Sequence, residues 1–485
     1  MAQSDPNAPG ASNAPDISGA ANPQAKFLTG ALMKHIAVMA MASSVGLMVV
    51  FLVDFVDMVF IAMLGKAELA AAIGYAGAIL FFTGSFGIGV AIAAGALVAR
   101  ALGQGDIALA RQRGTNALTI GFTLGALFAA TVWFNIDTLV GLLGATGDTR
   151  ILAVDFMQII LPSLPILLFG IVCSAILRAH GDARRSMLAM IAGGLVNAVL
   201  DPILIFGFGL ELTGAAMASI AARITLATLT FGWIRKYHQG LARFHPGPVL
   251  RDFGPVMGIA LPAILTQLAT PVGQAWVTRA MASYGEDAVA GMAIVGRLTP
   301  VSFGILFALS GAVGPIIGQN AGAGQAGRVR QTFRDALIFT GVVSVTVATI
   351  LFGLRGGLEW LFQLEGEARQ LVFLFAGPLA LLWFFNGVIF VSNAAFNNLG
   401  RPFLSTLVNW GRHTLGTIPF VVLGGWLWHA PGVLIGQAAG GVVFGLLAWA
   451  LARRVMADRG GAKQPGPQDA FARQGRLLAL FTLRR

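Results

Sequence analysis

The first long apolar segment of the chain, residues 35–64, reads HIAVMAMASSVGLMVVFLVDFVDMVFIAML. As a helix it would rise about 1.5 Å per residue, which is enough to cross roughly 30 Å of hydrocarbon. The whole chain shares this character, because 56% of its residues are hydrophobic and only 11% are charged. Soluble domains carry about 25% charged residues. The apolar runs lack the alternation of a membrane β-barrel. The sequence therefore predicts an all-α integral membrane protein.

Twelve such segments follow one another along the chain. They lie near 35–64, 69–99, 116–136, 151–177, 186–209, 212–234, 253–283, 288–318, 335–354, 370–396, 403–426 and 431–452. We expect a disordered cytoplasmic tail over 1–30, an N-lobe over 31–235, a basic cytoplasmic loop over 236–251, a C-lobe over 252–455 and a basic tail over 456–485. The polar start, rich in Ala, Asn, Pro and Ser, is not a secretory signal.

The positions of the basic residues predict the orientation of the chain. Most of the 32 lysines and arginines fall on one set of loops and on the two tails, while the acidic residues are divided evenly. This is the positive-inside pattern, so we expect both termini in the cytoplasm and the protein in a bacterial inner membrane. The net charge of +11 is explained without a nucleic-acid partner. A single cysteine excludes a disulfide framework.

The two halves of the sequence repeat. Leu102-Gly103-Gln-Gly105 corresponds to Ala321-Gly322-Ala-Gly324, and Arg178-Ala-His-Gly181 corresponds to Asn397-Asn-Leu-Gly400. Both pairs are offset by 219 positions, as Gly103 and Gly322 illustrate. An even number of spans in each half gives the two lobes the same topology, related by an axis along the membrane normal. Such transporters place their site near the midplane and move by rocking one lobe against the other.

Several short motifs, in order, resemble the multidrug and toxic compound extrusion (MATE) family over roughly residues 30–455. They are Val56-Asp57-Met-Val-Phe-Ile-Ala-Met-Leu-Gly65, Ala101-Leu-Gly-Gln-Gly-Asp106, Leu177-Arg-Ala-His-Gly-Asp182, Asn197-Ala-Val-Leu-Asp-Pro202, Gly214-Ala-Ala-Met-Ala-Ser219, Gly258-Ile-Ala-Leu-Pro262 and Ile317-Gly-Gln-Asn-Ala-Gly-Ala-Gly324. The resemblance implies twelve helices in two pseudo-symmetric six-helix lobes, a MATE/MOP-type fold. It also implies export of amphipathic, often cationic, compounds in exchange for H⁺ or Na⁺.

The chain departs from that family pattern at three places. The proline that often bends the first helix is replaced by Ala42, whose repeat counterpart is Pro262. Some branches carry an acid in the tenth helix, where spacing places Asn386, and a glutamate in the seventh helix, which this chain lacks. The first difference argues against a mechanism driven by bending of that helix, because proline is the commonest cause of kinks.

Four acidic residues lie within predicted spans: Asp54, Asp57, Asp155 and Asp201. A carboxylate at the centre of a membrane helix costs about 2.5–3.5 kcal/mol on insertion scales, so such residues mark functional sites by default. Asp155 is near a helix end, where snorkelling explains it. The repeat counterparts of Asp57 and Asp201 are apolar, so maintenance of the fold does not require either acid.

Asn197 and Asp201 are one helical turn apart and therefore share a helix face. Together with Asp57 and Ser219 they match the N-lobe cation site of the DinF-like MATE branch. Two carboxylates, an amide and a hydroxyl could bind a proton, or could bind Na⁺ through the oxygen ligands that hard cations prefer. The structural alternatives are a cap or kink at Asp201 before Pro202, and interhelical hydrogen bonds for the other polar groups.

Two further residues are possible modulators of this site. Asp54 lies one turn before Asp57 and either raises the local negative charge or pairs with Arg223 in the sixth span. We expect the pair, because an unpaired buried charge is the costlier state. Arg297, Arg412 and His413 are interpreted as snorkelling residues.

The sequence thus predicts a cation-coupled multidrug antiporter and not an enzyme. It contains no Walker-type nucleotide-binding motif, so an ATP-driven pump is excluded, and no cofactor is expected. The expected partners are small amphipathic organic compounds, H⁺ or Na⁺ and the lipid bilayer, with no obligate protein partner. The first alternative is a flippase for an amphipathic lipid or lipid-linked sugar, which would be expected to have a basic cavity. The second is a passive channel or sensor, which would be expected to repeat its lining in both lobes.

Overall fold

The computed structural model describes residues 25–458, and within them it contains helices and no strands. The predicted tails therefore lie mostly outside the described residues. The long helices are α1 (Leu32–Met63), α2 (Ala67–Gly103), α3 (Ile107–Phe134), α5 (Gly147–Ile160), α6 (Leu164–Ala179), α7 (Ala183–Pro202), α8 (Glu211–Tyr237), α9 (Pro246–Ala282), α10 (Glu286–Gly322), α11 (Ala326–Phe362), α13 (Ala380–Asn398), α14 (Phe403–His413) and α15 (Ile418–Asp458). Short segments join them: η1 (Lys26–Leu28), α4 (Ile136–Leu142), η2 (Leu161–Ser163), η3 (Ile203–Gly207), α12 (Gly366–Leu374) and η4 (Phe375–Leu379).

Some membrane spans are built from more than one of these elements. The fourth span joins α5, η2 and α6, and the tenth joins α12, η4 and α13. Eleven helical segments of the described chain are long and apolar enough to cross a membrane, and the last, Phe403–Asp458, has 56 residues. A single crossing needs only about 20 residues, so this last segment is long enough for two.

The two crossings in that segment are separated by a sharp reversal inside α15. The backbone leaves helical geometry at Trp428 and at His429, whose φ is +55°, and Pro431 follows. Beyond the reversal the helix returns along itself. A Cβ on Gly432 would lie 1.8 Å from the carbonyl oxygen of Gly424, and one on Gly436 would lie 2.2 Å from that of Phe420. The predicted twelve spans are therefore confirmed.

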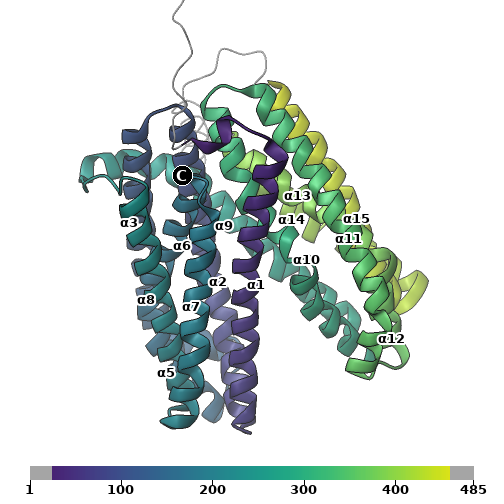
Figure 1. The fold of residues 1–485 in the computed structure, drawn as a ribbon. Coiled ribbons are helices and arrows are strands. Elements are labelled where there is room, and N and C mark those ends of the chain that lie inside the picture. The colour runs from purple at the N-terminus through teal and green to yellow at the C-terminus, as the bar shows by residue number, and fades with distance from the viewer. Residues whose placement is uncertain (1–24, 459–485) are drawn as a thin grey trace, which may run out of the picture.

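The spans form two bundles that meet at one end and separate at the other. Figure 1 shows α1 to α8 as one bundle, with α10 to α15 leaning away from it towards the end marked by α12. The described chain ends on the side where the bundles meet. Helix α9 lies between them and packs against both α2 and α14. The outcome is an open V, with its mouth opposite the ends of the described chain.

The bundles are joined by a close crossing of α2 and α10 that explains the repeated glycine motif. A Cβ on Gly103 would lie 2.0 Å from the carbonyl oxygen of Gln319, and one on Gly322 would lie 2.1 Å from that of Arg100. Gly103 and Gly322 are repeat counterparts, as are Arg100 and Gln319. The repeat seen in the sequence is therefore a symmetric contact in space, placed on the axis that relates the bundles.

The end of the predicted N-terminal tail is ordered against this crossing. Phe27, in η1, is 2% exposed. Its backbone N–H donates to Gln319 Oε1 at 3.0 Å, and its carbonyl oxygen accepts from Asn320 Nδ2 at 3.2 Å. The expectation of disorder up to residue 30 is thus wrong for residues 25–30, because a buried aromatic ring fixes them.

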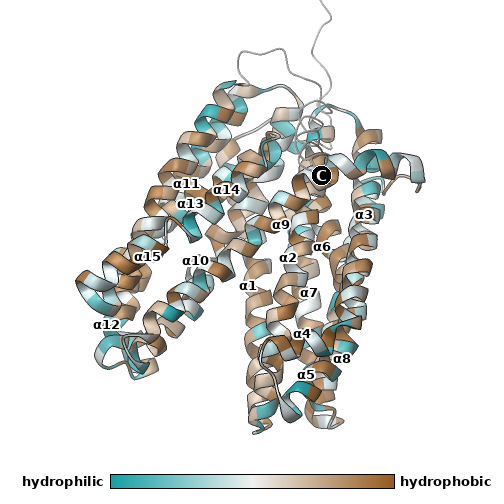
Figure 2. Cartoon of the chain, turned by 180° about the vertical axis from the view of Figure 1, so that it is seen from behind, coloured by the Kyte–Doolittle hydropathy of each residue, from teal (hydrophilic) through white to brown (hydrophobic). Residues whose placement is uncertain are grey.

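The outer surface is apolar, as expected for a surface facing lipid. Trp360 is 81% exposed and Leu142 is 79% exposed. Figure 2 shows hydrophobic residues along the helices of both bundles. Soluble monomers rarely expose apolar patches on this scale. Helix α1 continues through Ala42 over its 32 residues without a break.

Candidate functional site

The candidate cation site lies inside the N-terminal bundle, where α1 packs against α7. The carboxyl groups of Asp57 and Asp201 are within hydrogen-bonding reach of each other once one of them carries a proton. Asp201 is 0% exposed and Asn197 is 2% exposed. Both carboxylate oxygens of Asp201, both amide atoms of Asn197 and Oδ1 of Asp57 are buried without a hydrogen-bond partner. Buried polar groups are normally paired, so this cluster is suited to receive a cation.

Small residues and a helix irregularity bring these groups together. A Cβ on Gly194 would lie 2.6 Å from a methyl group of Val49, so this glycine allows α7 to approach α1. Directly after Asp201, Pro202 removes a backbone donor, and the helix widens into the π-helical turn η3. Gly214 of α8 packs against the backbone of that turn. A Cβ added to this glycine would lie 2.8 Å from the backbone of Leu204. Such turns often occur at functional sites.

Ser219, the fourth predicted ligand, is not joined to the other three by a hydrogen bond within residues 25–458. It lies half-buried on α8, which packs against α7. Within the same residues there is also no group of three or more His, Cys, Asp or Glu side chains placed to hold a metal ion. Of the four predicted ligands, Asp57, Asn197 and Asp201 are the ones with buried oxygen atoms that lack a hydrogen-bond partner among the described residues.

The predicted ion pair between Asp54 and Arg223 is wrong. Arg223 donates to the carbonyl oxygen of Ile160 at 3.1 Å and to the hydroxyl of Ser163 at 2.7 Å. Asp54 is exposed on α1. Arg223 is thus bonded to η2 and the residue before it, whereas Asp54 is exposed on α1. The sequence could not reveal this difference.

A cavity of about 750 Å³ occupies the space between the two bundles. Its lining is rich in amides, which are Gln267, Gln274, Asn386, Asn393, Asn397, Asn398, Asn409 and Gln437. The cations Arg178 and Arg412 also line it, together with His413. Among residues 25–458, no aspartate or glutamate lines it. The carboxyl pair Asp57 and Asp201 is not part of this lining, so candidate cation site and cavity are separate.

The interpretation of Arg412 and His413 as snorkelling residues is therefore wrong. Helix α14 ends at His413, and the turn that follows places both side chains at the cavity instead of at a membrane surface. A signal was present in the sequence: Ser405, Asn409 and Arg412 recur at helical spacing within an apolar span, which makes a polar stripe. Arg178 was also missed, because its motif suggested a cytoplasmic loop.

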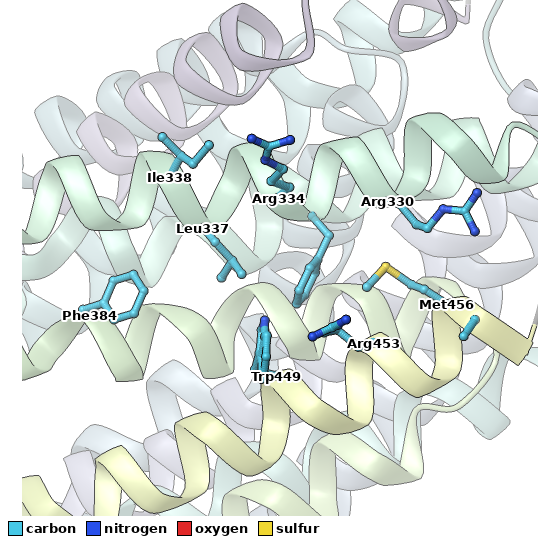
Figure 3. Close-up of a pocket in the computed structure, with 10 residues that line it drawn as sticks. Arg330, Arg334, Leu337, Ile338, Phe384, Trp449, Arg453 and Met456 are labelled. Carbon is cyan, nitrogen blue, oxygen red and sulfur yellow. The ribbon is translucent and has the colours of Figure 1, made fainter.

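A second pocket, of about 570 Å³, lies on the C-terminal bundle between α11, α13 and α15. Figure 3 shows the residues that line it, among them Arg330 and Arg334 on α11 and Trp449 and Arg453 on α15. The Arg453 guanidinium lies 4.8 Å from the centre of the Trp449 ring. This pocket shares no lining residue with the central cavity, so its arginines provide controls for those of the cavity.

The charged motif between α6 and α7 is structural. Asp182 caps α7 through the backbone N–H of Arg185, binds the Arg185 guanidinium and accepts from His238 at 3.0 Å. Burial would raise the pKa of Asp182, but the hydrogen bonds from His238 and Arg185 outweigh it and lower that pKa to about 2. Burial lowers the pKa of His180 to about 4, and the centre of its ring lies 4.6 Å from that of His238, with the two rings tilted by 37°.

Comparison with known proteins agrees with this architecture. The profile of the MatE family matches residues 42–203 and 262–423, one stretch in each half. The chain is 28% identical over 423 residues to a Shewanella oneidensis protein named FAD transporter, covering 86% of this chain and 93% of the relative. It is 24% identical over 322 residues to the Staphylococcus aureus multidrug export protein MepA, covering 65% and 69%.

Solved structures show the same fold. The MATE transporter VcmN of Vibrio cholerae has a TM-score of 0.84 at 24% identity, covering 88% of this chain and 97% of that one. A MOP superfamily transporter of Pyrococcus furiosus has a TM-score of 0.81 at 21% identity, covering 90% and 99%. The chain belongs to the MatE family of multi-pass membrane transporters.

Proposed function

We propose that the protein is a secondary active exporter of amphipathic organic compounds, driven by entry of H⁺ or Na⁺ at Asp57 and Asp201. The observation that carries this proposal is the buried carboxyl pair, which has no hydrogen-bond donor in the described part of the chain and lies beside the amide of Asn197, likewise unpaired there. Two like charges in a low-dielectric interior repel each other strongly, so a proton or Na⁺ stabilises the pair when it binds.

Helix α1 supplies a physical connection between the cation site and the cavity. Leu47 and Phe51 line the cavity, whereas Asp57, farther along the same helix, faces α7. The same helix also contacts the C-terminal bundle, because Met48 of α1 packs against Gly304 of α10. A Cβ added to Gly304 would lie 2.8 Å from the Sδ atom of Met48. Cation binding removes the repulsion between α1 and α7 and thereby favours a shift of α1 against α10. A shift of this kind would change the cavity without any direct contact between cation and cargo.

The membrane potential supplies enough free energy for this coupled export. One net positive charge entering down about 100 mV releases roughly 2.3 kcal/mol, which sustains a substrate gradient of about 40-fold. We place the coupling in the inner membrane of a bacterium with both termini in the cytoplasm, as the distribution of basic residues predicts. The V would then open towards the outside, which suits release of cargo after cation entry.

The names of the relatives give two classes of cargo to compare. The Shewanella relative is named for FAD, and the Staphylococcus relative for multidrug export. The resemblance of the motifs favoured a cationic cargo, but no acidic residue of the described chain lines the cavity. Gradient-driven transport is therefore best tested with a cationic dye, ethidium, and an anionic flavin, FMN, side by side.

The experiment uses the full-length protein in proteoliposomes with an imposed pH or Na⁺ gradient. Wild type should accumulate one of the two probes against its gradient, which a channel cannot do. Asp57→Asn and Asp201→Asn should abolish this accumulation and still permit counterflow of the probe. Asp155→Asn is the matched control, because Asp155 is an exposed acid of α5 outside the site. Equal accumulation by Asp57→Asn and wild type would remove the coupling role.

A lipid flippase is the second candidate, and the two cavity arginines favour it more than the sequence did. Translocation of a fluorescent anionic phospholipid between leaflets separates the two functions. An exporter leaves the rate of lipid translocation at that of empty liposomes.

A further inference from the structure

The two arginines of the central cavity have no acidic partner among residues 25–458. Arg178 comes from α6 in the N-terminal bundle, and Arg412 comes from α14 in the C-terminal bundle. The Arg178 guanidinium donates to Ser186 Oγ at 2.9 Å and lies 3.9 Å from a Cβ built on Gly311 of α10. Neither arginine takes part in an ion pair with any residue from 25 to 458. A desolvated cation without a counter-charge is costly, so these two side chains are prepared to bind an anion.

One face of α13 adds aromatic rings and amides to the same cavity. Trp383, Asn386, Phe390, Asn393 and Asn397 recur at helical spacing, and all five line the cavity. The stripe alternates between flat apolar surfaces and hydrogen-bonding amides. Such an alternation suits a heteroaromatic ring system, which is apolar on its faces and polar at its edges.

The aromatic part of this wall is continued by α10. Phe307 lies 5.8 Å from Trp383 and 5.3 Å from Phe390, measured between ring centres. Behind it, Phe303 is buried and stacks on Trp383 at 4.7 Å with an interplanar angle of 11°. The Trp383 ring is thus held in place from behind, which makes it a preorganised surface for a planar ligand.

The amides retain free capacity for hydrogen bonds. Asn386 Oδ1 and Asn398 Oδ1 are buried and have no hydrogen-bond partner. Other amides are bonded within the wall, as where Asn409 Nδ2 donates to Asn393 Oδ1 at 3.2 Å. A buried oxygen without a donor costs free energy until a ligand supplies one. Ring N–H groups of a heteroaromatic ligand would supply such donors.

We propose that the central cavity binds an anionic heteroaromatic compound, with its ring system against Trp383, Phe307 and Phe390 and its phosphate or carboxylate group on Arg178 and Arg412. This inference rests on the proposed function, in that it names the class of cargo for the proposed exporter. Guanidinium groups bind phosphate and carboxylate through paired hydrogen bonds. The cavity volume of about 750 Å³ is within the range of about 300–1,000 Å³ typical of sites for ligands of this size.

An anionic cargo has a consequence for the driving force. Export of an anion and entry of a cation both move positive charge inward, so a membrane potential that is negative inside drives both. Exchange of a monovalent cation for H⁺ would move no net charge. Transport of an anionic probe should therefore increase with an imposed potential of this sign in the absence of a pH gradient.

Two probes test the class directly, because riboflavin and FMN share one ring system and differ by a phosphate group. Binding to the full-length protein in detergent is measured by quenching of flavin fluorescence, without any gradient. We expect FMN to bind at least tenfold more tightly than riboflavin and to resist displacement by ethidium. Arg178→Gln and Arg412→Gln should each weaken the binding of FMN at least tenfold and leave the affinity for riboflavin within about twofold of wild type.

The controls separate charge, fold and aromatic contact. Arg334→Gln removes an arginine of the second pocket (Figure 3) and should leave both affinities unchanged. Arg412→Lys keeps a cation and should retain part of the preference for FMN, so a fold defect is distinguished from loss of charge. Trp383→Leu should weaken the binding of FMN and of riboflavin by the same factor. Equal affinity for FMN and riboflavin, no binding of either at millimolar concentration, or tighter binding of ethidium would overturn the proposal.

The coupling proposal and the cargo proposal fail in different ways. Asp57→Asn should bind FMN like wild type and lose only gradient-driven accumulation. If this variant accumulates FMN normally, coupling at Asp57 is refuted while the cavity assignment stands. If accumulation of ethidium depends on Asp57 and FMN is not bound, the cargo assignment is refuted and coupling stands. Translocation of an anionic phospholipid that depends on Arg412, without FMN binding, would likewise overturn the cargo assignment.

Discussion

Gly103 of α2 meets the backbone of Gln319 in α10 so closely that a Cβ on the glycine would lie 2.0 Å from the carbonyl oxygen of Gln319. The repeat counterpart, Gly322, meets the backbone of Arg100 in the same way at 2.1 Å. Small residues permit such close approach of membrane helices. These two contacts join the bundles at the end where the V is closed, which makes this crossing the natural pivot for any rocking motion.

A side chain at either glycine should therefore disrupt the closed end. We expect Gly103→Ala and Gly322→Ala each to destabilise the protein by about 1–3 kcal/mol, as overpacked interiors do. Melting in detergent, followed by loss of monodisperse protein, measures the effect. Gly77→Ala, in the same α2 helix but with no atom within 4 Å of an added Cβ, is the control and should change stability little. Equal melting temperatures for all three variants would contradict the close approach.

His180 should make stability depend on pH in the mildly acidic range. Burial lowers its pKa to about 4 in the folded state, below the ordinary value of about 6.5. The unfolded chain therefore takes up a proton first as the pH falls, so folding stability is lost progressively from about pH 6.5 to about pH 4. The slope should approach about 1.4 kcal/mol per pH unit, and His180→Gln should flatten it. Identical slopes for the variant and wild type would count against this role.

Asp182 should contribute stability that disappears only in strong acid. Its pKa is lowered to about 2, so the contribution is complete above the ordinary value of about 3.9 and is lost as the pH falls through about 2. At neutral pH, Asp182→Asn should cost about 2 kcal/mol. Asp106→Asn, at the cap of α3, is the control, because Asp106 accepts from Leu109 N at 2.8 Å and forms no ion pair within the described chain. A cost for Asp182→Asn no larger than that for Asp106→Asn would argue against the network with His238 and Arg185.

Arg223 should be coupled to Ser163 and independent of Asp54. Double-mutant cycles on melting stability measure both relationships. Arg223→Gln combined with Ser163→Ala should give a coupling energy of about 1 kcal/mol, because the hydrogen bond of 2.7 Å joins them. Arg223→Gln combined with Asp54→Asn should be additive within about 0.5 kcal/mol. Strong coupling in the second cycle would restore the ion pair that the geometry excludes.

Much of the fold could be predicted from the sequence, because membrane helices are read from local properties. The apolar runs predicted twelve spans, and the last two, 403–426 and 431–452, are divided where the backbone reverses at Trp428 and His429. The constant offset between Gly103 and Gly322 predicted two lobes of one topology. Lipid imposes these features on each helix separately, since every backbone group must be satisfied within the helix.

The candidate cation site was predicted in part for a similar reason. Asn197 and Asp201 share a face because they are one turn apart, and that follows from helical periodicity alone. That Asp57 approaches Asp201 depends on the contact of Gly194 with Val49, which only the packed structure contains. Whether these groups bind a cation stays a prediction.

The surroundings of each polar face were decided by the tertiary structure. Arg412 was interpreted as a snorkelling residue, because helical spacing alone does not tell whether its face meets lipid, headgroups or the cavity between the bundles. The structure turns it to the cavity, directs Arg223 to Ser163 and leaves Asp54 unpaired among residues 25–458. The sequence by itself determined which residues lie together on one helix. Only packing decided what each face meets, because the rotation of a helix is set by contacts with neighbours that are distant in the chain.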